Sequence, residues 1–341
     1  MKYSSLFIVL IIIIFGSCKK STEDAIGQNE TYNVYVAGSE YNGYRYVAKY
    51  WKNGTAVNLT DGTNDAYGNS IFVSGNDIYV AGTESNGYHF VAKYWKNGKA
   101  VNLSDGAVNE YAKSIFVSGN DVYVAGNGGF VAKYWKNGKA VNLTDGTIFA
   151  EANSIFVSGN EIYVAGYESS IENYSVAKYW RNGKAVNLTD GTKFAVANSI
   201  FVSGNDIYTS GYEGDIVYYE GNNKTHYVAK YWKNNTDINL TDGSQSALAE
   251  SVFVSGNDIY VAGREKTNGS FSDAKYWKNG AVITLTDGTT DAYGKSIFVS
   301  RNDVYLAGGD GFEAKYWKNG ATVNLTEGSK FAEANSIFVS K

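Results

Sequence analysis

The sequence predicts an all-β fold, a seven-bladed β-propeller of four-stranded antiparallel blades, from three observations. The segment Ala-Lys-Tyr-Trp-(Lys/Arg)-Asn occurs seven times, and successive copies are 40 to 52 residues apart, close to the length of one propeller blade. The chain has 29 Tyr and 38 Gly but no Pro, a composition typical of strands and turns. Four short apolar runs separated by Gly, Asn and Asp accompany each copy. The copies contain every tryptophan of the chain: Trp51, Trp95, Trp135, Trp180, Trp232, Trp277 and Trp317.

Each repeat is predicted to hold four strands, which the second copy illustrates. Its strands are expected at residues 70–74, 78–82, 90–95 and 100–104. Gly75-Asn76-Asp77 and Asn97-Gly98 are hairpin turns, because Gly and Asn tolerate the positive φ that tight hairpins require. The first and third strands are apolar on both faces, so each sheet is expected to lie between two others, as in a propeller.

The two ends of the repeat region predict how the ring closes. The region begins with a segment of second-strand type, Tyr32–Gly38, and ends with one of first-strand type, Ser336–Ser340. Pairing of these segments completes the first blade from both ends of the chain and leaves no unpaired blade. A leucine-rich solenoid is the alternative, but it repeats every ~20–29 residues with one strand per unit.

The N-terminal residues predict export and a lipid anchor. Lys2 precedes the apolar run Leu6–Phe15, which is too short to span a bilayer, and Gly16-Ser17 then precede Cys18. This pattern resembles the lipobox of bacterial lipoproteins, with Phe15 where Leu is usual, and the polar segment after Cys18 resembles that of surface lipoproteins of the Bacteroidota. The resemblance implies a signal peptide at 1–17, a lipidated Cys18, and an outer-membrane or cell-surface location. The polar composition that follows predicts a flexible tether, so 18–31 holds Cys18 and the tether, and the repeats predict the propeller at 32–341. A cleaved signal without lipid, or a short uncleaved anchor, is the alternative.

The repeats also resemble a known family. Tyr-Trp-x-Asn-Gly, Leu-Thr-Asp-Gly and Ser-Ile-Phe-Val-Ser-Gly are similar to the extracellular HAF-type repeats, although Ala-Lys-Tyr-Trp stands here for Ala-Phe-Leu-Trp. The resemblance extends from Tyr32 to Lys341. It implies an exported repeat protein and no particular activity.

Loop lengths indicate which end of the blades is the binding face. Each Trp is 19 residues before the Ser that opens the next first strand, so all length variation falls between the second and third strands. These loops and the crossovers between blades share one face, and such loops are where recognition is usually placed. Drift among solvated loop residues is the alternative explanation. The predicted ligand-binding residues are Tyr44, Tyr67, Tyr111, Glu151, Asp215, Tyr218, Tyr219, Tyr293 and Glu333.

The chemistry of the chain favours binding over catalysis. The net charge is −4 with no basic run, which argues against nucleic acid as a partner. With two His and one Cys, no metal cluster, catalytic triad or phosphate loop is recognisable, so no catalytic residue, cofactor or metal is predicted. Asp-Gly-Thr-x-Asp at residues 61–65 and 287–291 is a calcium alternative to ordinary turn chemistry. The lysine of each Ala-Lys-Tyr-Trp is expected to lay its stem on aromatic rings and keep its ammonium in water.

We therefore expect a lipid-anchored, exported propeller that binds a glycan or a surface protein without catalysis. Two alternatives remain open. One is a structural or adhesive surface protein. The other is a glycan-cleaving enzyme that uses two carboxylates of the loop face, drawn from Glu151, Glu213, Asp215, Glu220 and Glu333.

Overall fold

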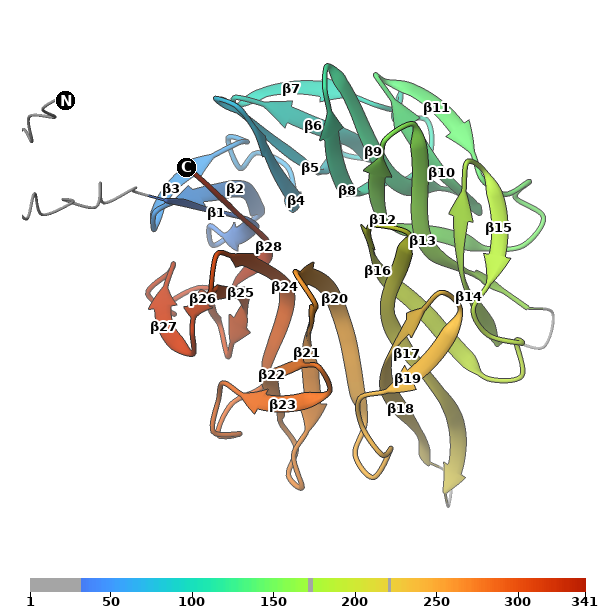
Figure 1. Cartoon of the computed structure of the whole chain (residues 1–341). Coiled ribbons are helices and arrows are strands. Elements are labelled where there is room, and N and C mark those ends of the chain that lie inside the picture. The colour runs from blue at the N-terminus through green and yellow to red at the C-terminus, as the bar shows by residue number, and fades with distance from the viewer. Residues whose placement is uncertain (1–31, 171–173, 220–221) are drawn as a thin grey trace, which may run out of the picture. The chain divides into compact units, whose positions relative to one another are not determined.

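The computed structural model describes residues 32–170, 174–219 and 222–341. Side chains are described for all of these residues except 216–219 and 222–225. Residues Tyr32–Lys341 form one compact unit. Within this unit the described residues form 28 strands and no helix, so no helix capable of crossing a membrane is found in this part of the chain (Figure 1). The predicted signal peptide, Cys18 and tether lie outside the described residues.

The strands fall into seven groups of four antiparallel strands, and each group is ordered from an inner to an outer strand (Figure 1). The inner strands are β4 (Ala66–Ser74), β8 (Glu110–Ser118), β12 (Ala150–Ser158), β16 (Phe194–Ser203), β20 (Ala247–Ser255), β24 (Ala292–Ser300) and β28 (Ala332–Ser340). The second strands are β1 (Asn33–Tyr41), β5 (Asp77–Ser85), β9 (Asp121–Gly128), β13 (Glu161–Ser169), β17 (Asp206–Tyr219), β21 (Asp258–Lys266) and β25 (Asp303–Asp310). The third strands are β2 (Tyr46–Lys52), β6 (Phe90–Lys96), β10 (Val131–Lys136), β14 (Ser175–Arg181), β18 (Asn222–Lys233), β22 (Ser272–Lys278) and β26 (Glu313–Lys318). The outer strands are β3 (Thr55–Asn58), β7 (Lys99–Asn102), β11 (Lys139–Asn142), β15 (Lys184–Asn187), β19 (Thr236–Asn239), β23 (Ala281–Thr284) and β27 (Ala321–Asn324).

We number the groups by the chain order of their second strands, so group 1 is β28-β1-β2-β3 and group 7 is β24 to β27. Among the described residues, five groups are separate sheets, whereas groups 4 and 5 share an eight-stranded sheet. One parallel residue pair, Ser175 with Phe194, joins these two groups through β14 and β16. In group 1 the last strand pairs with the first, in a register that places Val339 opposite Val34. The all-β fold and its four-stranded antiparallel unit are thus confirmed.

The apolar core lies between neighbouring groups, as two-sided apolar strands require. Each of seven buried clusters combines residues of two consecutive groups, and one of them joins group 7 to group 1. The seven Trp side chains are each 1% exposed within these clusters. They are therefore packing residues and do not form a surface for ligand stacking.

Two sets of contacts follow the inner strands all the way round. A phenylalanine of each inner strand contacts the same residue of the next, with ring centroids 4.9–5.0 Å apart, and the seven contacts return to their start. In parallel, a backbone N–H of each inner strand donates to a serine hydroxyl of its neighbour at 3.1–3.3 Å. The phenylalanines of the first set of contacts are Phe72, Phe116, Phe156, Phe201, Phe253, Phe298 and Phe338.

The lysine of each third strand corrects one expectation. These side chains are largely buried, and each ammonium forms an ion pair with a carboxylate instead of remaining in water. Burial of an ammonium is tolerated only when it is paired, which explains why an acid recurs beside every lysine. The pairs are Lys49–Glu40, Lys93–Glu84, Lys133–Glu110, Lys178–Glu168, Lys230–Glu213, Lys275–Glu265 and Lys315–Asp310.

Two predicted loop segments are strands. The inner strands begin about four residues before the expected serine, because a bulge, as between Gly68 and Ser70, lets pairing continue into the crossover. The segment from Tyr212 to His226, one of the connections predicted as loops between second and third strands, is a hairpin arm in which β17 and β18 stay paired up to Tyr219 and Asn222.

Candidate functional site

The loop face is the end of the unit that carries the β1–β2 type of turn and the crossovers into the inner strands. Tyr44 lies at the tip of the β1–β2 turn and is 87% exposed. The other candidates with described side chains lie in strands: Tyr67, Tyr111, Glu151, Tyr293 and Glu333 in inner strands, and Asp215 in β17. Tyr218 and Tyr219 also lie in β17, but their side chains are outside those that the structure describes.

Six aromatic residues form a continuous strip on this face, which we call the aromatic arc. Successive ring centroids are 6.2, 6.1, 5.2, 6.1 and 5.6 Å apart. Five of the rings are half-buried, and the first is 65% exposed. The arc runs from group 7 through groups 1 and 2 to group 3, and its members are Phe312, Phe331, Tyr46, Tyr67, Phe90 and Tyr111.

The extent of the arc follows from a position at which the repeats differ. The residue two before each Ala-Lys-Tyr-Trp is aromatic in groups 1, 2, 3, 5 and 7, but it is Ser175 in group 4 and Ser272 in group 6. In group 4 the hydroxyl of Ser175 is buried and donates to the carbonyl of Ala195 at 2.7 Å. The two serines thus remove the aromatic residue at this position from groups 4 and 6, whereas groups 7, 1 and 2 keep it and supply Phe312, Tyr46 and Phe90 to the arc. Sequence reasoning identified Tyr67 and Tyr111, but it missed Tyr46, Phe90, Phe312 and Phe331 as members of one surface.

Burial raises the pKa of two tyrosines of this face, Tyr67 and Tyr293. Burial first, and then the nearby carboxylates of Asp65 and Glu333, raises the pKa of Tyr67 to about 12. Burial and the neighbouring Glu333 also raise the pKa of Tyr293, whose hydroxyl has no hydrogen-bond partner among the described residues. At neutral pH these phenols are therefore uncharged and able to donate hydrogen bonds.

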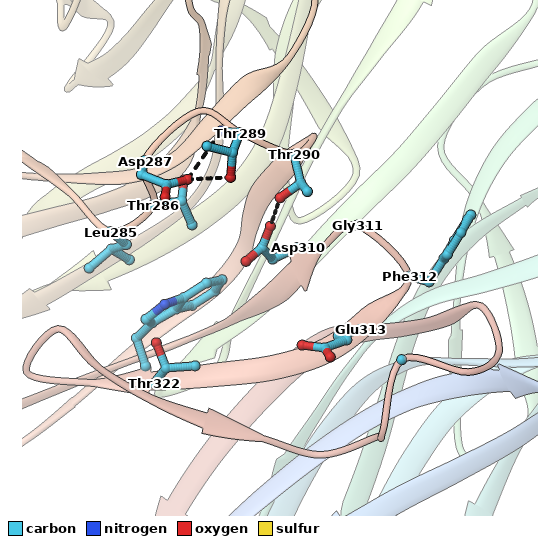
Figure 2. A pocket seen from close by; sticks show the side chains of 12 residues that line it. Leu285, Thr286, Asp287, Thr289, Thr290, Asp310, Gly311, Phe312, Glu313 and Thr322 are labelled. Atoms are coloured by element: carbon cyan, nitrogen blue, oxygen red, sulfur yellow. Dashed lines mark hydrogen bonds between the residues drawn. The ribbon is translucent and has the colours of Figure 1, made fainter.

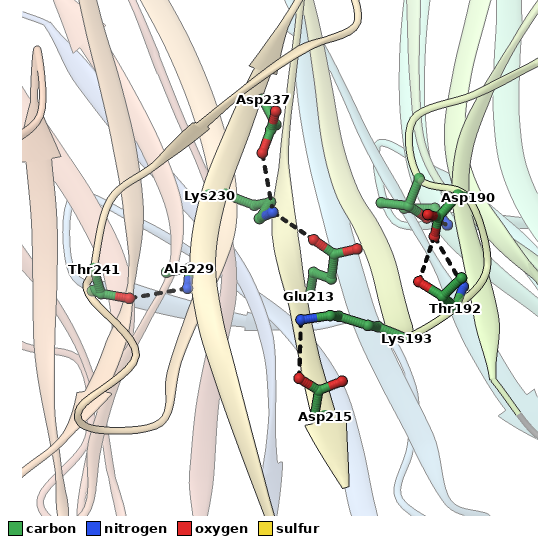
Figure 3. Close-up of polar contacts among 11 residues, drawn as sticks. Asp190, Thr192, Lys193, Glu213, Asp215, Ala229, Lys230, Asp237 and Thr241 are labelled. Atoms are coloured by element: carbon green, nitrogen blue, oxygen red, sulfur yellow. Dashed lines mark hydrogen bonds and ion pairs between the residues drawn. The ribbon is translucent and has the colours of Figure 1, made fainter.

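Three of the predicted carboxylates are already engaged with lysines of the chain, whereas Glu333 forms no ion pair with a lysine among the described residues. Glu151 accepts from the ammonium of Lys113 at 2.5 Å. Asp215 is paired with Lys193 at 2.9 Å (Figure 3). Glu213 lies 2.6 Å from the buried Lys230, beside Asp237 (Figure 3). Any ligand oxygen that approaches these carboxylates therefore competes with an ammonium for the same lone pairs.

The acids of the two Asp-Gly-Thr-x-Asp segments are occupied by local hydrogen bonds. Asp61 accepts from both the backbone and the hydroxyl of Thr63, and Asp65 accepts from the backbone of Tyr46 at 2.9 Å. These bonds to Thr63 hold the pKa of Asp61 below its usual value. No group of three or more His, Cys, Asp and Glu that could hold a metal ion occurs in the described part of the chain. Turn chemistry accounts for this segment without calcium.

A hollow of about 700 Å³ opens at the group 7 end of the arc (Figure 2). One wall is the crossover that leaves group 6, with Asp287 and Thr290, and the other comes from group 7. Asp310 accepts a hydrogen bond from Thr290, Glu313 points across from β26, and Phe312 stands at the rim (Figure 2). Smaller hollows of about 380 and 420 Å³ flank Lys193 and Lys230 at the corresponding place in group 5.

Comparison with solved structures identifies the architecture. The β-propeller domain of the Trilobed protease from Pyrococcus furiosus, described as having an open velcro topology, is similar over 87% of this chain and 95% of its own, with 12% identity and a TM-score of 0.50. The fold is a β-propeller. A structure from a study of two prolyl endopeptidases is similar over 91% of this chain at 13% identity, with a TM-score of 0.50.

These similarities concern the fold alone. This propeller spans about half the length of the endopeptidase chain, 50%. No protein-family model matches the sequence, and no curated protein matches it. The site must therefore be interpreted from its own residues.

Proposed function

We propose that the chain is a closed, seven-bladed propeller, anchored through a lipid on Cys18 and exported to the outer membrane or cell surface, which binds a glycan on its loop face without catalysis. Each group is one blade, and groups 4 and 5 are separate blades that touch through a single bridging pair. Closure is supported by the cycle of seven phenylalanine contacts and by the cluster that joins group 7 to group 1.

The aromatic arc is the observation that carries the binding proposal. Half-buried rings offer apolar faces for the C–H surfaces of sugars, while the phenols of Tyr46, Tyr67 and Tyr111 supply hydroxyl groups that can donate and accept. A binding surface needs this combination of rigid apolar area and a few polar atoms that set orientation. Four of the six rings, those of Tyr46, Tyr67, Phe90 and Tyr111, lie on strands of the scaffold, so little conformational freedom is lost there when a ligand binds.

Catalysis has weaker support. Glu151, Glu213 and Asp215 each bind a lysine ammonium, so a glycosidic oxygen or water would have to displace it. A glycan-cleaving enzyme needs two free carboxylates facing one another across the scissile bond. Glu220 lies outside the described residues.

A neutral and acidic glycan array, probed with the purified protein, tests the proposal. We expect selective binding of one class of oligosaccharide, without shortening of the oligosaccharide on prolonged incubation. Absence of binding across the array overturns the glycan proposal, and release of shorter products overturns the non-catalytic one.

A protein partner is the second candidate. Tyr44 and Tyr88 are 87% and 91% exposed at the tips of the first two loops, and exposed tyrosines are typical anchors of protein interfaces. Replacing both with alanine distinguishes the two candidates. Loss of cell-surface protein capture with unchanged glycan binding supports the protein partner, whereas loss of neither activity counts against it.

A further inference from the structure

The hollow at the end of the arc differs from the equivalent positions of the other groups in two residues. Glu313 lies where five groups carry valine and the sixth an aspartate: Val47, Val91, Val131, Val176, Val228 and Asp273. Asp310 lies where five groups carry glutamate: Glu40, Glu84, Glu168, Glu213 and Glu265. Both changes fall in the wall of the same hollow.

The change to Asp310 opens space, and the change to Glu313 adds an acceptor. Aspartate is one methylene shorter than glutamate, so the carboxylate of Asp310 reaches Lys315 at 3.0 Å from a retracted position. Glu313 binds the same ammonium, also at 3.0 Å, and 31% of its side chain remains exposed. Two carboxylates in the wall of the hollow therefore share one lysine ammonium. Their combined negative charge is larger than the positive charge of Lys315.

The turn above the hollow is short, which keeps it open. In groups 1 and 2 the longer loop places an asparagine over the next crossover, where Asn86 donates to the carbonyl of Gly106 at 3.1 Å. In group 7 the turn is reduced to Gly311-Phe312, and the ring of Phe312 stands at the rim, joined to the arc through Phe331 at 6.2 Å. The hollow is thus continuous with the proposed binding surface.

We propose that this hollow is the end subsite of the arc and takes the terminal, uncharged sugar unit of a linear glycan. This inference rests on the proposed function and deepens it. A volume of about 700 Å³ is within the range of small-molecule sites. Hydroxyl groups of the sugar donate to Glu313, Asp310 and the threonine hydroxyls, and the apolar face of the ring packs on Phe312. The excess of carboxylates rejects a uronic acid or a sulfated end, because like charges repel strongly when water is displaced.

Glu313→Val tests the subsite with little risk to the fold, because five groups already carry valine there and Lys315 keeps Asp310. The matched control is Asp237→Val, which removes the second carboxylate from Lys230, the other doubly paired lysine. The probes are cellohexaose, maltohexaose and mannohexaose, together with the same oligosaccharides oxidised to uronic acids at their terminal units. Kd values are measured by titration calorimetry.

For the hexasaccharide that binds, we expect Glu313→Val to raise Kd at least about tenfold and Asp237→Val to change it less than about twofold. The oxidised form is expected to bind wild type weakly, and the valine variant should discriminate less between the two forms. If arc variants lose binding while Glu313→Val does not, the subsite is wrong and the proposed function stands. If neither loses binding, both are wrong.

Discussion

Each buried third-strand lysine is paired with an acid, and the contribution of this ion pair to the free energy of unfolding can be measured directly. In group 3 the usual glutamate position is Gly128, and the charge of Lys133 is met instead by Glu110 of the inner strand, at 2.7 Å. The two side chains are only 12% and 14% exposed. Glu110→Ala therefore leaves an ammonium buried without a partner, which costs roughly 3 kcal/mol or more.

The same group offers its own rescue. A Cβ built on Gly128 would lie 2.3 Å from Oε1 of Glu110, so a side chain at 128 occupies the space that Glu110 fills. The φ of Gly128 is outside the positive range, so no backbone strain opposes a glutamate there. Combining Glu110→Ala with Gly128→Glu should thus recreate the Lys93–Glu84 arrangement and return stability to within about 1 kcal/mol of wild type.

The assay is thermal and urea unfolding of the wild type, the two single variants and the double variant. At roughly 2 °C per kcal/mol for a chain of this size, Glu110→Ala should lower Tm by about 6 °C. Gly128→Glu alone displaces the flexible end of Glu110 and should cost about 1 kcal/mol or less. Additive losses in the double variant would refute the reasoning, because they would show that a glutamate at 128 does not replace Glu110 as the partner of Lys133.

Three further outcomes are expected. Phe156→Ala, which removes two contacts of the inner ring cycle, should lower the free energy of unfolding by about 3 kcal/mol, and Phe149→Ala on the loop face by much less, as measured by urea unfolding. The pKa of Tyr67 is about 12 in the folded protein against an ordinary 10.0. The neutral phenol therefore contributes fully to the free energy of unfolding below pH 10, and this contribution declines as pH rises toward 12. A Tyr67→Phe variant should show a smaller loss of Tm at alkaline pH. Cys18→Ala should move the protein from the membrane fraction to the soluble fraction and abolish labelling by a fatty-acid analogue.

Most of the architecture could be predicted because it is repeated. Seven copies of Trp51 and its surroundings, with hairpin turns at fixed spacing, indicate the four-strand unit, and Asn53 and Gly54 adopt the positive φ values that the Asn-Gly turn requires. The pairing of β28 with β1 followed from the strand types at the two ends of the repeat region. The early start of the inner strands was missed, because a bulge is invisible in an apolar pattern.

The side-chain contacts of the loop face were harder to predict. Tyr67 and Tyr111 were singled out because they vary. Their neighbours Tyr46 and Phe90 belong to third strands, and no pattern in the sequence indicated that their rings contact Tyr67. The burial of the third-strand lysines was also missed. A signal was visible, because most second strands carry a glutamate two residues after their last glycine, and this glutamate is the partner of the lysine. Glu110 had no such signal, because it compensates for a missing partner on a different strand.

The aromatic arc is the central element of this account, and one titration tests it most directly. The oligosaccharide selected on the array is titrated into wild type, a Tyr67→Ala/Tyr111→Ala variant and a Phe271→Ala control, whose ring is 43% exposed outside the arc. The account predicts that the double variant raises Kd at least about tenfold, since stacking on each ring is worth roughly 1 kcal/mol or more, while the control binds like wild type. Equal affinities for all three proteins would contradict it.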